Sequence, residues 1–239
     1  PDGPRVQFLG VFDTVGALGV PKTILGRIGI NKPFEFHDTE LSRVVKHSCQ
    51  ALAIDEGRIN FEPALWVNPR KPRKTGTVEQ VWFPGSHANI GGGGGDRKLS
   101  DLVLVWMLTR LLHHCPELKH NLSRDLCEEF ERPHCTGKKH PSREFWPLTR
   151  VINQIEPRRR WFYPSRLQRL PPHRRPIGEK LHVSALARLE QSKGYRPVNL
   201  RAVVERLQSN PNAVEVMGID GERIPGEALR LWLNTGAAD

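Results

Sequence analysis

The stretch Val-Gln-Phe-Leu-Gly-Val-Phe at residues 6–12, followed by Asp-Thr-Val-Gly at residues 13–16, decides the fold class of this chain. A short, nearly continuous apolar run of this kind is typical of a strand that is buried on both faces of a parallel sheet. The segment that follows in the sequence, which contains Gly16, is where such a strand would end. We therefore predict an α/β fold in which Asp13 lies at the carboxyl end of a strand.

Further segments extend this α/β pattern. Val-Glu-Gln-Val-Trp-Phe at residues 78–83 is predicted to form a second strand, which ends in Pro-Gly-Ser-His at residues 84–87. A capped and largely buried apolar helix is predicted from about residue 100 to His114. Apolar residues at near-helical spacing also predict a helix over residues 39–54.

The rest of the chain divides into a proline-rich segment and a more regular C-terminal part. Prolines and basic residues break any long helix in residues 116–180, which we interpret as an irregular or helical basic insertion or lid. Residues 181–239 are predicted to return to the core, with a helix near 199–208 and a hairpin over 214–224. The expected organisation is an α/β core at 1–115, followed by the insertion and the C-terminal segment.

The 239 residues are 38% apolar and 26% charged, which excludes a disordered polymer. No run approaches the roughly 18 apolar residues of a membrane-spanning helix, and the start does not resemble a signal peptide. Because the first residue is Pro1 rather than Met, the chain is expected to be a piece of a longer protein. The four cysteines form no Cys-x-x-Cys pair and indicate reduced thiols in a cytosolic context.

Positive charge is concentrated in one region of the chain. The whole chain has 36 Lys and Arg against 26 Asp and Glu, and residues 137–182 alone have 12 against 3. Such a region attracts phosphate-bearing partners through screened Coulomb forces, and a solvated basic surface without a partner is an equal alternative. The candidate residues for a lipid-facing patch are Arg158, Arg159, Arg160, Arg174 and Arg175.

Asp13 and His87 are the candidate catalytic residues because each follows an apolar strand and is followed by glycines. In open α/β sheets, catalytic groups gather at the carboxyl ends of the strands. A carboxylate there can orient an imidazole through its Nδ1 proton, so that Nε2 acts as a general base toward a hydroxyl. The alternative is that Asp13 caps a turn and that His87 is a loop residue bonded to the backbone.

Five consecutive glycines at 91–95 come shortly after His87. Their N–H groups could bind an oxyanion or a phosphate, so Gly91, Gly92 and Gly93 are candidate substrate-loop contacts, with a flexible connector as the alternative. The segment fits neither the dinucleotide-binding nor the P-loop pattern, and the scattered His and Cys residues fit no zinc motif. We therefore expect no metal and no cofactor.

Several motifs, in one order, resemble the α/β-hydrolase family that includes the type VI secretion phospholipase effectors and many uncharacterised domains. The similar segments are Phe8–Gly19, Gln50–Glu56, Phe61–Trp66, Val81–Gly93 and Leu99–Leu102, and more weakly Leu181-His182 and Tyr195–Leu200. The resemblance implies a Ser-Asp-His triad in which the aspartate matches Asp13 and the histidine matches His87. The chain departs from the family at Asn89 and Gly94, where an aspartate and an aromatic residue are common.

The serine of this implied triad is missing from the 239 residues. The family's serine belongs to a G-x-S-x-G elbow that precedes the aspartate, and the chain contains no such motif. We therefore expect the serine upstream of Pro1 and expect the chain by itself to be inactive. A substitute from within the chain, Ser86 or Ser48, is disfavoured, since Ser86 adjoins His87 and neighbouring residues on an extended segment point to opposite faces.

These observations favour the C-terminal part of an α/β-hydrolase that is active on esters in the intact protein, with phospholipids as the expected class of substrate. Its expected partners are the lipid substrate and an anionic membrane surface, with no nucleic acid; the oligomeric state stays open. The expected location is the cytoplasm, or export by a specialised system without a signal peptide. The alternative is a non-catalytic module that uses the basic surface to bind nucleic acid or a protein.

Overall fold

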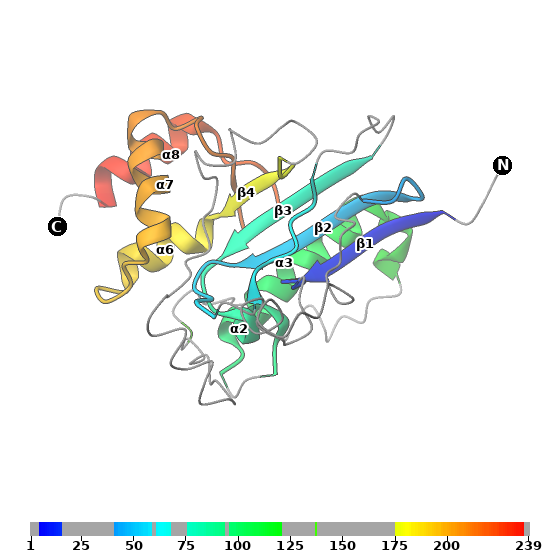
Figure 1. Cartoon of the computed structure of the whole chain (residues 1–239). Helices are drawn as coiled ribbons and strands as arrows, with labels where there is room; N and C mark the ends of the chain where they lie inside the picture. The colour runs from blue at the N-terminus through cyan, green and yellow to red at the C-terminus, as the bar shows by residue number, and fades with distance from the viewer. Residues whose placement is uncertain are drawn as a thin grey trace, which may run out of the picture.

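The computed structural model of the chain describes residues 5–15, 41–58, 61–67, 76–93, 96–120, 137 and 175–236. In this part of the chain, five strands form one parallel sheet in the order β1-β2-β3-β4-β5, which confirms the α/β fold class (Figure 1). The strands are β1 (Val6–Phe12), β2 (Val45–Ala53), β3 (Thr77–Phe83), β4 (Glu179–His182) and β5 (Val216–Met217). The helices are α2 (His87–Gly91), α3 (Lys98–His114), the 3₁₀ helix η2 (Pro116–His120), α6 (Val183–Gln191), α7 (Val198–Ser209) and α8 (Gly226–Gly236).

The two strands predicted from apolar runs are present as β1 and β3, and the predicted apolar helix is α3. Helix α3 packs closely on β1 at Gly10, where an added Cβ would lie 2.7 Å from the Met107 Sδ. A side chain at position 10 would therefore require the Met107 side chain to move, which favours a glycine in the middle of this strand.

The helix predicted over residues 39–54 is wrong, because residues 45–53 form the strand β2. Strand β2 pairs in parallel with β1 on one side and with β3 on the other. Its residues from Ser48 to Ala53 are all buried, since both faces of the strand are covered. Apolar residues then occur at nearly every position, and some of them match helical spacing by chance.

Alternate residues of the strands enter two separate cores, one on each face of the sheet. Leu52 and Trp82 pack with apolar residues of α6, α7 and α8, whereas Ala51 and Val81 pack with residues of α2 and α3. Figure 1 shows the same division, with α3 behind β1 and β2 and with α6, α7 and α8 gathered beside β4. The layered arrangement leaves the carboxyl ends of the parallel strands on one edge of the sheet.

The C-terminal part returns to this sheet. Strand β4 pairs with β3, β5 pairs with β4, and the predicted helix near 199–208 is α7. The predicted hairpin over 214–224 is reduced to a turn after β5, with an antiparallel bridge between Met217 and Arg223. The division into 1–115, 116–180 and 181–239 stays a prediction, because most of the insertion lies outside the described residues.

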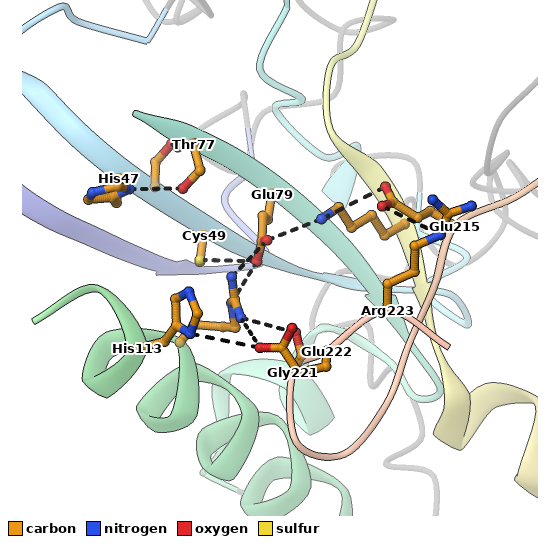
Figure 2. A network of polar contacts seen from close by, with 12 residues as sticks. His47, Cys49, Thr77, Glu79, His113, Glu215, Gly221, Glu222 and Arg223 are labelled. Carbon is orange, nitrogen blue, oxygen red and sulfur yellow. Dashed lines mark hydrogen bonds and ion pairs between the residues drawn. The ribbon is translucent and has the colours of Figure 1, made fainter. Parts of the chain in front are cut away.

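A buried network of charges joins the sheet to α3 and to the turn after β5 (Figure 2). The Glu79 carboxylate of β3 accepts hydrogen bonds from Arg110 Nη2 at 3.0 Å and from Lys180 Nζ at 3.1 Å. Arg110 also donates from Nη1 to the carbonyl oxygen of Gly221 at 3.0 Å. The Cys49 Sγ lies 3.7 Å from Glu79 Oε2, and burial together with that carboxylate raises the pKa of the thiol. Cys49 is therefore held as an unreactive thiol.

Candidate active site

The carboxyl ends of β1, β2 and β3 bring three short polar segments together. Asp13 follows β1 directly, Asp55 and Glu56 follow β2 within three residues, and His87 comes four residues after β3. Because these three strands are parallel neighbours, the segments behind them meet at one edge of the sheet.

Asp13 is fully buried and is held from two directions. Its backbone N–H donates to the carbonyl oxygen of Ala51 at 2.7 Å, and its Oδ1 accepts the N–H of Ala53 at 2.9 Å. Its φ of 48° lies in the left-handed region, which aspartate tolerates better than most residues. The backbone bend and the bond to β2 together fix the direction of the carboxylate.

His87 meets the second oxygen of this carboxylate. Its Nδ1 lies 2.7 Å from Asp13 Oδ2, while the His87 side chain keeps 31% of its surface exposed. A carboxylate can only accept here, so Nδ1 carries a proton, and in the neutral imidazole Nε2 is the proton acceptor. The structure thus brings together the two predicted catalytic residues, as an aspartate oriented toward an accessible imidazole.

The turn that carries His87 is fixed by its own side chains. Asn89 Oδ1 accepts from the Ser86 N–H and from the Ser86 hydroxyl, both at 3.0 Å, and the first of these bonds is part of the capping box that begins α2. Gly85 has a φ of 120°, and an added Cβ would lie 2.6 Å from the Asn89 Cβ. Asn89 therefore has a structural role at the position where the family commonly has an aspartate.

The two serines weighed as substitutes for the missing nucleophile are both buried. The Ser86 hydroxyl donates to Asn89, and the Ser48 hydroxyl donates to the carbonyl oxygen of Thr77 at 3.3 Å. Thr77 begins β3, so Ser48 lies toward the opposite end of the sheet from His87.

Glu56 connects the segment after β2 to His87. Its Oε2 accepts the His87 N–H at 3.2 Å, and its carboxylate is paired twice with Arg58, by Nε at 2.9 Å and by Nη2 at 2.8 Å. The Arg58 guanidinium lies 3.6 Å from the centroid of the Phe61 ring. Phe61 in turn meets the imidazole of His87 edge to face, with the ring centroids 4.9 Å apart.

The C-terminal segment braces the same turn from the other side. Asp55 Oδ2 accepts the Gly85 N–H at 2.7 Å, and the Tyr195 hydroxyl donates to both oxygens of Asp55 at 3.1 and 3.2 Å. Burial and the Asp55 carboxylate raise the pKa of Tyr195, so its hydroxyl stays a donor. Asn199 donates to the carbonyl oxygen of Ile54 at 2.8 Å. These contacts connect the segment Tyr195–Leu200 to the segments that follow β2 and β3.

Glu56, Phe61 and Tyr195 lie within the resembling motifs but had no predicted role, and Arg58 lies in none of these motifs. The signal available was the pair Asp55-Glu56 directly after an apolar run. That signal was lost because residues 39–54 were interpreted as a helix, whose end has no fixed relation to the edge of a sheet.

His182 is a second histidine at a carboxyl end of a strand, and it is fully enclosed. Its Nδ1 caps α6 by accepting the Ser184 N–H at 3.2 Å and lies 2.8 Å from the Ser184 hydroxyl. Burial lowers the pKa of His182 to about 3, so the ring is neutral at physiological pH. An imidazole without access to solvent or substrate serves here as a cap.

The structure describes only some of the other residues that were predicted to contact the substrate or the lipid surface. Gly91 ends α2, and Gly92 and Gly93 follow it with positive φ; an added Cβ at any of the three would meet no atom within 4 Å. Arg175 is exposed. The other four arginines of the candidate lipid-facing patch, Arg158, Arg159, Arg160 and Arg174, lie outside the described residues, as do the cysteines Cys127 and Cys135.

Within the described ranges, no helix is both long and apolar enough to cross a bilayer. Nor do any three described His, Cys, Asp or Glu side chains converge as metal ligands would.

The match to a family model agrees with the fold and with the resemblance of the motifs. Residues 2–110 match the model described as "T6SS, Phospholipase effector Tle1-like, catalytic domain". No curated protein and no solved structure matches the chain. The matched range includes Asp13, Glu56 and His87, and it supports a phospholipase-like hydrolase function. Over residues 2–110, this chain is similar to the catalytic domain of the Tle1-like phospholipase effectors of type VI secretion, which confirms the resemblance drawn from its motifs.

Proposed function

We propose that the natural protein is a serine-dependent ester hydrolase of phospholipids, in which Asp13 orients His87 and His87 is the general base. One observation carries this proposal: a fully buried carboxylate oxygen lies 2.7 Å from Nδ1 of an imidazole that is 31% exposed. The other oxygen of Asp13 is bonded to the Ala53 N–H, so the carboxylate has little freedom to turn away. This geometry suits an acid that orients and a base that reacts.

In the proposed reaction, His87 Nε2 takes the proton of a serine hydroxyl while the serine oxygen attacks the ester carbonyl of the lipid. Asp13 stabilises the imidazolium that forms. His87 then gives the proton to the leaving alcohol, which departs as the lysolipid, and the fatty acyl group stays on the serine. Water, deprotonated by His87, attacks the acyl ester and releases the fatty acid, and the proton returns to the serine.

The proposed serine comes from chain that precedes Pro1, because the family order is serine, aspartate, histidine and because no G-x-S-x-G motif occurs in the 239 residues. Strand β1 supports this arrangement. It is an end strand of the sheet in the described part of the chain, and its residues are exposed or half-buried. A further strand beside β1 would deliver a serine next to the Asp13–His87 pair.

The phospholipid substrate is supported by the family match, and the remaining functional predictions rest on the sequence. We propose that Gly91, Gly92 and Gly93 contact the substrate, in the open space that surrounds them. The basic segment with Arg158, Arg159 and Arg160 is proposed to meet anionic head groups. Export without a signal peptide fits a family of type VI secretion effectors.

The test is a His87→Ala variant of the natural protein with its preceding segment, assayed on phosphatidylglycerol vesicles by release of fatty acid. We expect kcat to fall at least about 10³-fold, since a triad loses its base. The matched control is His113→Ala, an exposed histidine of α3, which should retain wild-type kcat. Unchanged turnover in His87→Ala would reject His87 as the base.

The second candidate function is a non-catalytic module that keeps this scaffold and binds an anionic partner through the basic segment. It is favoured by the charge of residues 137–182, with 12 basic against 3 acidic residues. The codons upstream of Pro1 decide between the two: a G-x-S-x-G motif supports the enzyme, and its absence supports the module.

A further inference from the structure

A second buried carboxylate lies beside the Asp13–His87 pair. Glu56 is 2% exposed, and its Oε2 accepts the backbone N–H of His87 at 3.2 Å. This bond holds the first residue of α2 in place. A buried negative charge so close to an imidazole also favours the imidazolium, which cannot act as a base. The same carboxylate that positions His87 is thus a potential hindrance to its chemistry.

Arg58 removes this conflict. It pairs with both oxygens of Glu56 through Nε and Nη2 at 2.9 and 2.8 Å, and its backbone N–H donates to Oε1 at 2.8 Å. A guanidinium that is paired twice in this way is fixed in its plane and keeps its charge at any physiological pH. The negative charge of Glu56 is therefore neutralised within two residues of the chain.

Arg58 also fixes a wall of the site. Its guanidinium covers the Phe61 ring at 3.6 Å, and Phe61 presses edge to face on the His87 imidazole with a centroid distance of 4.9 Å. The ring of His87 is thus bounded by Asp13 at Nδ1 and by Phe61 on its side. An imidazole limited on two sides loses rotamers that would break the bond to Asp13.

We propose that Arg58 is a positioning residue for His87, which neutralises Glu56 and holds Phe61 against the imidazole. This inference rests on the proposed function and deepens it. The charged groups that contact His87 or its turn in the described structure are Asp13 after β1 and Asp55 and Glu56 after β2. Tyr195, from the segment between α6 and α7, donates to Asp55. Helix α2 contributes no titratable side chain other than His87.

The experiment measures kcat/KM against pH for the natural protein with its preceding segment, on phosphatidylglycerol vesicles. In Arg58→Gln, the loss of the guanidinium charge beside Glu56 should move the acid limb of the profile upward by about one pH unit. The rate at pH 7 should then fall several-fold and recover by about pH 9. Arg58→Lys, which keeps the charge, and Glu56→Gln/Arg58→Gln, which removes both charges, should leave the acid limb near its wild-type position.

A matched control separates this effect from a change in overall charge. Arg201→Gln removes an arginine from an exposed ion pair with Glu205 on α7 and should leave the profile unchanged. An acid limb at the wild-type position in Arg58→Gln, or the same displacement in the double variant, would overturn the proposal. A failure of the proposed function looks different, since His87→Ala would then hydrolyse lipid as well as the wild type does.

Discussion

The two ends of the sheet each hold a carboxylate paired with a basic side chain, and they differ in the exposure of the base. At the carboxyl end, Asp13 is buried while the His87 side chain is 31% exposed. In the first half of β3, the side chains of Glu79 and Arg110 are each 6% exposed. His87 can exchange its proton with a neighbour, whereas Arg110 stays charged at all physiological pH values. Pairing and burial alone therefore do not distinguish the two pairs; the proposed catalytic pair differs in having an accessible imidazole.

The largest predicted effect is a loss of activity in the variant Asp13→Asn of the natural protein, at the carboxyl end of the sheet. An asparagine tolerates the left-handed backbone and can still accept the Ala53 N–H, so the fold should survive. Its amide group can donate to Nδ1, which would leave the proton on Nε2 and abolish the base. We expect kcat on phospholipid vesicles to fall about 10³- to 10⁴-fold. A loss below about threefold would contradict the assigned role of Asp13.

A substitution in the buried Glu79–Arg110 pair should change the free energy of unfolding rather than the activity. Glu79→Gln removes the negative charge that compensates Arg110 and Lys180, both largely buried. We expect the free energy of unfolding in urea to fall by about 3 kcal/mol, with kcat unchanged well below the unfolding transition. The control is Glu222→Gln, whose side chain is 64% exposed at the rim of the same network and should cost less than about 0.5 kcal/mol. Equal losses in the two variants would refute the distinction between the buried pair and its rim.

The smallest predicted effect, over the range from pH 8 to pH 5, concerns His182 at the carboxyl end of β4. Burial lowers the pKa of His182 from an ordinary 6.5 to about 3, so the unfolded chain binds a proton there that the folded chain excludes. This difference does not lower the free energy of unfolding above pH 6.5. As the pH falls from 6.5 toward 3, it lowers the free energy of unfolding by about 1.4 kcal/mol per pH unit. His114, whose pKa is lowered to about 4 chiefly by burial, contributes with the same sign.

This prediction is checked by urea unfolding between pH 8 and pH 5 for the wild type and for His182→Asn. Asparagine is a good N-cap and does not titrate. Below pH 6.5, the slope of the free energy of unfolding against pH should therefore be smaller in the variant, by the amount that corresponds to about one bound proton. The exposed His113→Asn serves as the control. A slope for His182→Asn equal to that of the wild type would show that His182 does not exclude the proton.

The sequence predicted the strands that carry Asp13 and His87, because residues 6–12 and 78–83 are apolar runs with a distinct end. It failed at residues 45–53, where a strand covered on both faces has no period of two and imitates a helix. With that strand missing, the segment that contains Glu56 and Arg58 had no place at the site. The role of Tyr195 was equally out of reach, because its partner Asp55 lies 140 residues away.

The sequence by itself therefore determined the class of the fold, the order of its motifs and the two residues that are predicted to carry the chemistry. These properties depend on local patterns, in which a few neighbouring residues specify a strand, its end and the side chain that follows. Only the tertiary structure decided that β1, β2 and β3 are adjacent and that Asp13 and His87, 74 residues apart, meet at 2.7 Å. It also decided that Glu56 faces both Arg58 and His87. Such contacts depend on strand pairing and on burial across the whole sheet, which no single stretch of the chain encodes.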